Sequence, residues 1–98
     1  MSRVEFATGL VADFDRILEH LTEYEVADNS SRVQDIIAAF DVLERNPLIG
    51  RPAAGDNREL VIGRGPRGYV ALYRYVPSID TVLVLAVRSQ REAGFSRL

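Results

Sequence analysis

Two apolar segments decide the fold: residues 69–76, YVALYRYV, and residues 81–88, TVLVLAVR. In both, apolar side chains occupy both sets of alternate positions, which is typical of a strand that is covered on both faces. Strict alternation in the second segment predicts two opposite faces, Val82, Val84 and Ala86 against Leu83, Leu85 and Val87. The intervening residues 77–80, PSID, have the composition of a turn. The sequence therefore predicts a pair of central strands.

A third strand is predicted just before this pair, at residues 58–62. The segment that follows it, residues 63–68, reads GRGPRG, and three glycines and a proline within six residues cannot continue a ladder of strand pairing. We interpret this segment as the tip of a β-hairpin, which carries Arg64 and Arg67. Residues 51–57 contain proline, glycine, aspartate and asparagine and are predicted to form a loop.

The amino-terminal part of the chain predicts a short strand and a long helix. Residues 3–7 alternate weakly between polar and apolar side chains. From residue 8 to residue 27 the apolar residues recur three and four positions apart, which is the spacing of one helix face: Leu10, Phe14, Ile17, Leu18, Leu21 and Tyr24. Charged residues, including Asp13 and Arg16, are placed on the opposite, solvent-facing side.

A second helix is predicted after a turn at residues 28–30. Ser31 and Gln34 fit a capping box at its start, and Pro47 disfavours helix at the preceding residue and so ends it. The predicted order is β-α-α-β-β-β in a single domain over residues 1–98. This is an α+β fold, in which an N-terminal strand and an antiparallel helical hairpin pack on a small, mainly antiparallel β-sheet. The helices cover one face of the sheet, and we expect a partner on the other.

Composition excludes several classes of protein. A chain of 98 residues has room for one core, so a multidomain enzyme is excluded. It has no cysteine and one histidine, which excludes disulfides and thiolate metal sites, and we expect no metal and no cofactor. No segment has the length and hydropathy of a membrane span and the N-terminus lacks a secretory signal, so we expect a cytoplasmic protein without a membrane partner.

Charge is unevenly distributed along the chain, although the net charge is only -2. Residues 1–48 hold ten acidic residues and four arginines, whereas residues 49–98 hold four acidic residues and eight arginines. There is no lysine, so all basic residues are arginines, whose planar guanidinium groups pair with carboxylates and phosphates. The second half of the chain is therefore predicted to receive an anionic partner.

Three tyrosines of the first quoted segment, Tyr69, Tyr73 and Tyr75, share one strand face by alternation. They are interpreted either as an aromatic ladder that packs on the helices or as a platform on which nucleic-acid bases stack. Arg74 points to the opposite face, among apolar residues, and is interpreted as a structural residue that is paired with a buried acid or lies near an open edge.

Three motifs resemble small toxins of the ParE/RelE superfamily, the toxin halves of bacterial type II toxin-antitoxin pairs. They are Gly50-Arg51-Pro52 within NPLIGRPAAGDNREL, the aromatic strand GYVALYRY, and the apolar strand with its arginine-containing tail, TVLVLAVRSQREAGF. The resemblance spans nearly the whole chain and includes the helix-helix-sheet order. It implies a toxin that is neutralised by an antitoxin whose C-terminal segment wraps around it, and that contacts operator DNA only through the antitoxin.

The residues favour the ParE branch, whose members poison DNA gyrase, over the RelE branch, whose members cut mRNA in the ribosome. RelE-type nucleases carry an arginine directly after the first tyrosine of the third strand, where this sequence has Val70, and end in a tyrosine, where it offers Phe95. An acidic chain, with a pI near 5.3, is also poorly suited to an RNA cleft. Ser89 departs from the ParE pattern as well, because relatives often have histidine there.

The first hypothesis is therefore a toxin without chemistry of its own that binds DNA gyrase, at its A subunit, and inhibits growth. The predicted target-binding residues are arginines of the second half: Arg58, Arg64, Arg67, Arg88 and Arg91. The second hypothesis is a ribosome-dependent endoribonuclease with a rearranged set of Tyr73, Arg74 and Arg88. The third is a non-toxic relative that only binds the antitoxin.

Overall fold

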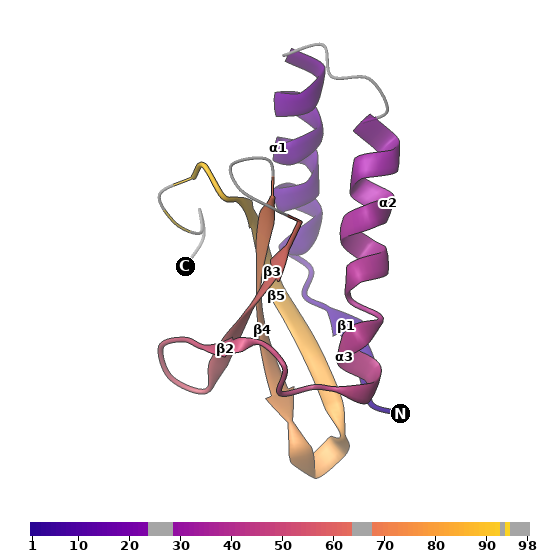
Figure 1. Cartoon of the computed structure of the whole chain (residues 1–98), viewed down its shortest axis with the longest axis vertical. Coiled ribbons are helices and arrows are strands. Elements are labelled where there is room, and N and C mark those ends of the chain that lie inside the picture. The colour runs from indigo at the N-terminus through magenta and orange to yellow at the C-terminus, as the bar shows by residue number, and fades with distance from the viewer. Residues whose placement is uncertain (24–28, 64–67, 93, 95–98) are drawn as a thin grey trace.

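In a computed structural model of the chain, two helices lie on one face of a five-stranded sheet (Figure 1). The structure describes residues 1–23, 29–63, 68–92 and 94. The helices are α1 (Leu10–Glu23), α2 (Asn29–Ala39) and the short α3 (Val42–Arg45). The strands are β1 (Arg3–Phe6), β2 (Arg51–Pro52), β3 (Asn57–Ile62), β4 (Tyr69–Val76) and β5 (Thr81–Ser89), with a 3₁₀ turn at Pro77–Ile79 between the last two. None of the described helices is long and apolar enough to cross a bilayer.

The sheet has the strand order β1-β5-β4-β3-β2. β1 pairs with β5 in parallel, from Arg3 opposite Thr81 to Phe6 opposite Val84, and the other neighbours are antiparallel. The α+β class and the mainly antiparallel sheet are therefore confirmed, with one parallel pair that joins the first strand to the last. β4 coincides with the predicted segment, residues 69–76.

The prediction of a loop over residues 51–57 is wrong at both of its ends. Arg51 and Pro52 form β2, which pairs with Glu59 and Arg58 of β3, and Asn57 already belongs to β3. Proline is tolerated in β2 because this strand is the edge of the sheet, where a missing N–H group breaks no ladder.

The helix boundaries also differ from the prediction. α1 begins at Leu10, two residues later than expected, and its predicted end lies outside the described residues. α2 begins at Asn29, so Ser31 is inside the helix and is not its cap. The predicted single second helix is broken, because Phe40 and Asp41 donate to carbonyls three residues back, which tightens the chain before α3 begins.

An irregularity in β5 overturns the predicted alternation of its faces. Leu72 of β4 lies opposite Ala86, but the next residue, Tyr73, lies opposite Val84, so Leu85 is an extra residue on β5. A β-bulge of this kind shifts the period by one residue. As a result Val87, and not Ala86, joins Val82 and Val84 in the core beneath the helices.

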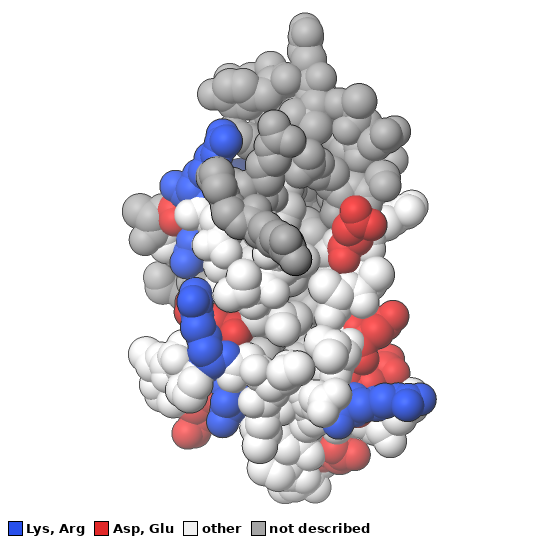
Figure 2. Space-filling view, in the orientation of Figure 1, with Lys and Arg blue, Asp and Glu red and all other residues white. Residues whose placement is uncertain are grey.

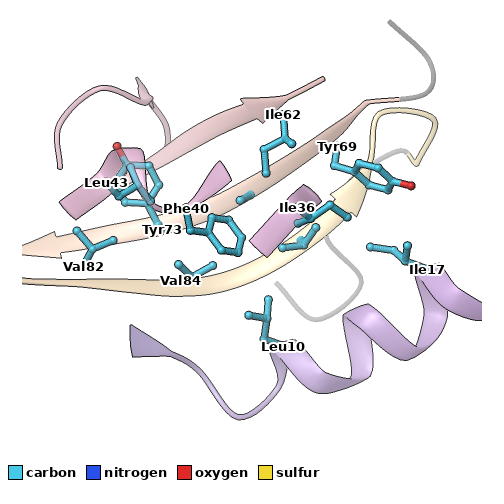
Figure 3. Packing of buried hydrophobic residues seen from close by; sticks show 12 residues of the cluster. Leu10, Ile17, Ile36, Phe40, Leu43, Ile62, Tyr69, Tyr73, Val82 and Val84 are labelled. Atoms are coloured by element: carbon cyan, nitrogen blue, oxygen red, sulfur yellow. The ribbon is translucent and has the colours of Figure 1, made fainter. Parts of the chain in front are cut away.

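The core fills the space between the helices and the sheet (Figure 3). Leu10 and Ile17 of α1, Ile36 of α2, and Phe40, which directly follows α2, pack on strand residues of the sheet. The buried cluster consists of Leu10, Ile17, Ile36, Phe40, Leu43, Ile62, Tyr69, Ala71, Tyr73, Val82, Val84 and Val87. The tyrosines thus form the aromatic ladder that packs on the helices, and the alternative of a base-stacking platform is wrong, because Tyr73 is completely buried.

Candidate target-binding surface

The face of the sheet that the helices leave open carries several arginines. Pairing between strands places Arg74 of β4, Arg88 of β5 and Arg51 of β2 on this face, because residues directly opposite one another share a face. Figure 2, in the orientation of Figure 1, shows several basic side chains along the margin away from α2 and α3, with acidic side chains among them, and both acidic and basic side chains on the margin of α2 and α3.

Arg74 and Arg51 are the exposed cations of this face. The Arg74 Nε donates to Asn57 Oδ1 at 3.1 Å, and the Arg51 Nε lies 3.0 Å from Glu59 Oε1 in an ion pair. Neither was among the predicted target-binding residues. Alternation along β4 placed Arg74 correctly on the open face, whereas Arg51 was hidden by the prediction of a loop.

Apolar residues of the same face are largely covered. Val70 is completely buried and Leu72 is nearly so, although both point away from the helices. This confirms the sequence interpretation of β4 as a strand covered on both faces. Val61 of β3 lies opposite Val70 and is 45% exposed. Among the described residues, the open face therefore presents the Arg74 and Arg51 guanidinium groups, the latter paired with Glu59, and Val61 as an exposed apolar side chain.

Arg58, a predicted target-binding residue, has an internal role. It lies opposite Tyr73, on the side of the sheet that faces the helices. Its Nη1 donates to the carbonyls of Leu48 at 3.1 Å and Gly50 at 2.8 Å, so it fixes the segment that connects α3 to β2. A contact between Arg58 and a target stays a prediction.

The same segment explains the Gly50-Arg51-Pro52 motif. The Gly50 N–H donates to the Tyr73 hydroxyl at 2.8 Å, and a Cβ atom at Gly50 would lie 2.7 Å from both the Tyr73 Cε1 and the Glu59 carbonyl oxygen. Only glycine fits this approach. Burial raises the pKa of the Tyr73 phenol, against the smaller opposing effects of the Gly50 hydrogen bond and the Arg58 charge.

The remaining predicted arginines follow or flank the central strands. Arg88 is half-buried, and its Nη1 donates to the carbonyls of Ser89 at 3.2 Å and Glu92 at 3.0 Å. Arg91 is exposed, and within residues 68–92 no ion pair involves its guanidinium. Arg64 and Arg67 lie outside the described residues.

A buried polar network at α1 was missed by the sequence analysis. Asp13, predicted to face solvent, is 1% exposed, and its Oδ2 accepts the Val87 N–H at 3.1 Å. Arg16 Nη2 donates to the Val87 carbonyl at 3.2 Å. β1 ends opposite Val84, so these two side chains bind the backbone of β5 where its neighbouring strand has stopped. The helical period cannot reveal this, because it assigns charged side chains to solvent.

Arg16 is also bound to the segment after β5. Its Nη1 lies 3.0 Å from Asp13 Oδ1 and its Nε lies 2.7 Å from Glu92 Oε1. The hydrogen bond to Glu92 is the main reason why the pKa of Arg16 is raised, with Asp13 contributing less. The guanidinium is therefore held in its charged form between two carboxylates.

The rearranged nuclease set is not brought together. Tyr73 points to the helices, whereas its partners in that hypothesis, Arg74 and Arg88, are on the open face. The Tyr73 hydroxyl is also occupied by the Gly50 N–H. This set therefore cannot act as one catalytic group.

Comparison with known proteins agrees with the fold. A structure described as the chromosomal ParDE TA system from P. aeruginosa matches with a TM-score of 0.73 and 23% identity, over 91% of this chain and 96% of that chain. The E. coli RelBE toxin-antitoxin complex matches with a TM-score of 0.63 and 13% identity, over 94% and 100%. The RelBE2 toxin-antitoxin complex from Mycobacterium tuberculosis matches with a TM-score of 0.57 and 25% identity, over 91% and 98%.

No curated protein sequence matches the chain significantly. Residues 4–94, however, match the family described as the ParE toxin of the type II toxin-antitoxin system parDE. This match covers helices α1 to α3, strands β2 to β5, and β1 except for Arg3. The chain therefore belongs to the ParE toxin family of type II toxin-antitoxin systems.

Proposed function

We propose that this ParE-family toxin inhibits DNA gyrase by binding its A subunit, and that a cognate antitoxin neutralises it by direct binding. The observation that carries the proposal is the arginine-bearing open face of the sheet, with Arg74 and Arg51 exposed and Arg91 beyond the end of β5. Guanidinium groups on a fixed strand surface are suited to carboxylates or phosphates of a large partner.

Inhibition by binding requires no catalytic group in the toxin. An exposed guanidinium attracts an anionic surface and can pair with it in two parallel hydrogen bonds. A toxin bound in this way stalls gyrase in its cycle, so cleaved DNA accumulates. The geometry favours binding over RNA cleavage, because the candidate nuclease residues point to opposite faces of the sheet.

Exposed apolar side chains on the helical side support the antitoxin partner. The described residues that expose them include Val11 of α1, Ile37 of α2 and Val42 of α3, and also Leu48 and Ile49. An amphipathic segment that folds on binding covers such side chains and stabilises the folded toxin by mass action. Two of the similar structures are described as toxin-antitoxin complexes, which is consistent with this partner.

The test is a supercoiling and DNA-cleavage assay with purified gyrase, with and without the antitoxin, beside a control for cleavage of ribosome-bound mRNA. We expect inhibited supercoiling, accumulated cleaved DNA and reversal by the antitoxin. Cut mRNA with unaffected gyrase would favour the nuclease, and no effect in either assay would favour a non-toxic antitoxin-binding relative.

Two charge-reversal variants test whether the toxin inhibits gyrase through the open face of the sheet. Arg74→Glu is expected to weaken gyrase inhibition roughly tenfold, because it replaces an attraction with a repulsion. Arg45→Glu is the matched control, since Arg45 is exposed but lies on α3 in the helical layer. Equal inhibition by both variants would exclude the open face as the binding surface.

A further inference from the structure

The chain closes a tight turn directly after β5. The Glu92 N–H donates to the Ser89 carbonyl at 3.1 Å, and the Ser89 N–H donates to Glu92 Oε2 at 3.0 Å. The Arg91 N–H donates to the Ser89 hydroxyl at 3.2 Å, and Arg88 Nη1 donates to the Glu92 carbonyl. Glu92 therefore contributes its N–H, its carbonyl and its carboxylate to this turn.

The turn is attached to α1 by a bidentate ion pair. Arg16 donates from Nε to Glu92 Oε1 at 2.7 Å and from Nη2 to Oε2 at 3.0 Å. Both side chains are about one third exposed, so water weakens the pair without removing its directionality. Arg16 is itself fixed by the buried Asp13, which binds the backbone of β5. A continuous set of hydrogen bonds thus runs from the core to Glu92.

The charge of Glu92 is unexpected in this position. It is an acidic residue directly after Arg91 and in contact with Arg88, two arginines that are proposed to receive an anionic partner. If the surface acted through net charge alone, Glu92 would weaken binding by repelling the partner. Its hydrogen bonds indicate another role, because they fix the backbone that carries Arg88 and Arg91.

We propose that Arg16 and Glu92 form a clamp that positions Arg88 and Arg91 for the toxin's target. Both are positioning residues, which act through the turn and not by touching the target. The inference rests on the proposed function in that it assumes a target bound by these arginines, but it does not depend on which macromolecule that target is.

The clamp and net charge predict opposite results for one substitution. Glu92→Gln removes a negative charge, so net charge alone predicts a stronger toxin, whereas loss of the clamp predicts a weaker one. Arg16→Lys keeps the positive charge but loses the bidentate geometry, and it is also expected to weaken the toxin. Glu19→Gln is the matched control, because Glu19 is an exposed carboxylate on the same helix as Arg16.

Two measurements on the full chain test the proposal. Hydrogen exchange should show roughly tenfold faster exchange of the Ser89 and Arg91 amides in Glu92→Gln and Arg16→Lys, with core amides of β4 unchanged. Growth inhibition on expression without antitoxin should fall in both variants and not in the control. Unchanged exchange, or a Glu92→Gln toxin at least as potent as the parent, would overturn the clamp.

Failure of the proposed function is distinguishable from failure of the clamp. A parent protein that halts growth without affecting gyrase removes the proposed target, while weaker toxicity and faster exchange in the two variants still support the clamp. If the parent and the Glu92→Gln variant inhibit gyrase equally well, the proposed target is supported and the clamp is rejected.

Discussion

The absence of a side chain at Gly50 allows the segment before β2 to pack closely against Tyr73 and the backbone of Glu59. In Gly50→Ala the new Cβ would meet backbone at Glu59 and the ring of Tyr73, neither of which can move freely. We expect the free energy of unfolding to fall by about 1–3 kcal/mol, as for other overpacked sites. Urea denaturation measures this change, and Gly94→Ala is the control, since, among the described residues, no atom outside its own chain neighbours lies within 4 Å of a Cβ there. A fully stable Gly50→Ala protein would show that the segment can shift.

Individual elements differ in how far the sequence predicts them. The boundaries of β4 follow directly from its apolar and aromatic residues, and the helical period places Leu10, Ile17 and Ile36 in the core. The bulge at Leu85 is not predictable from alternation, because every residue nearby is apolar and either register looks acceptable. β2 was missed because two residues of an edge strand, one of them proline, resemble a loop.

The candidate site was predicted less well than the fold. Composition predicted an arginine-bearing half, but which arginines are free to bind depends on contacts between distant segments. Arg58 is engaged by the Leu48 and Gly50 carbonyls, and Arg88 by the turn at Glu92. Alternation along β4 predicted the face on which Arg74 lies, but a sequence pattern does not predict the hydrogen-bond partners of a side chain.

At the scale of elements, Asp13 of α1 accepts a hydrogen bond from the backbone of β5 at Val87, beyond the point where the neighbouring strand β1 ends. Asp13→Ala removes the acceptor of the Val87 N–H and one carboxylate partner of Arg16. We expect a loss of about 3 kcal/mol in the free energy of unfolding, at the lower end for breaking a buried pair because Arg16 is partly exposed. Thermal or urea denaturation checks this. Asp15→Ala, an exposed change on the same helix, should stay within about 0.5 kcal/mol of the parent.

At the scale of the whole molecule, Asp80 links the N-terminal segment to the turn between β4 and β5. Its Oδ1 accepts hydrogen bonds from the Ser2 hydroxyl at 2.6 Å and the Tyr75 hydroxyl at 2.8 Å. These bonds, that of Ser2 first, hold the pKa of Asp80 below its ordinary value of 3.8. Its stabilising contribution is therefore present above pH 3.8 and is lost as the pH falls through the lowered pKa.

Asp80→Asn tests this linkage without straining the backbone, because asparagine tolerates the positive φ of 47° at this position. Near neutral pH the parent should be more stable than the variant. The difference should shrink as the pH falls below 3.8, since protonated Asp80 is then also uncharged. Urea denaturation of both proteins over a series of pH values measures it. A difference that is independent of pH would reject the lowered pKa.

The parallel pairing of β1 with β5 also has a consequence for biosynthesis. Arg3–Phe6 of β1 are translated before their strand partners at residues 81–84, which lie more than 70 positions later in the sequence. Pairing across so many residues is slow, because the intervening chain must be ordered before the contact is favourable. β1 therefore has no strand partner during most of translation, and it pairs with the sheet only once β5 has been translated. The nascent sheet is thus incomplete until β5 has been translated, which gives a co-expressed binding partner time to be made before the toxin is folded.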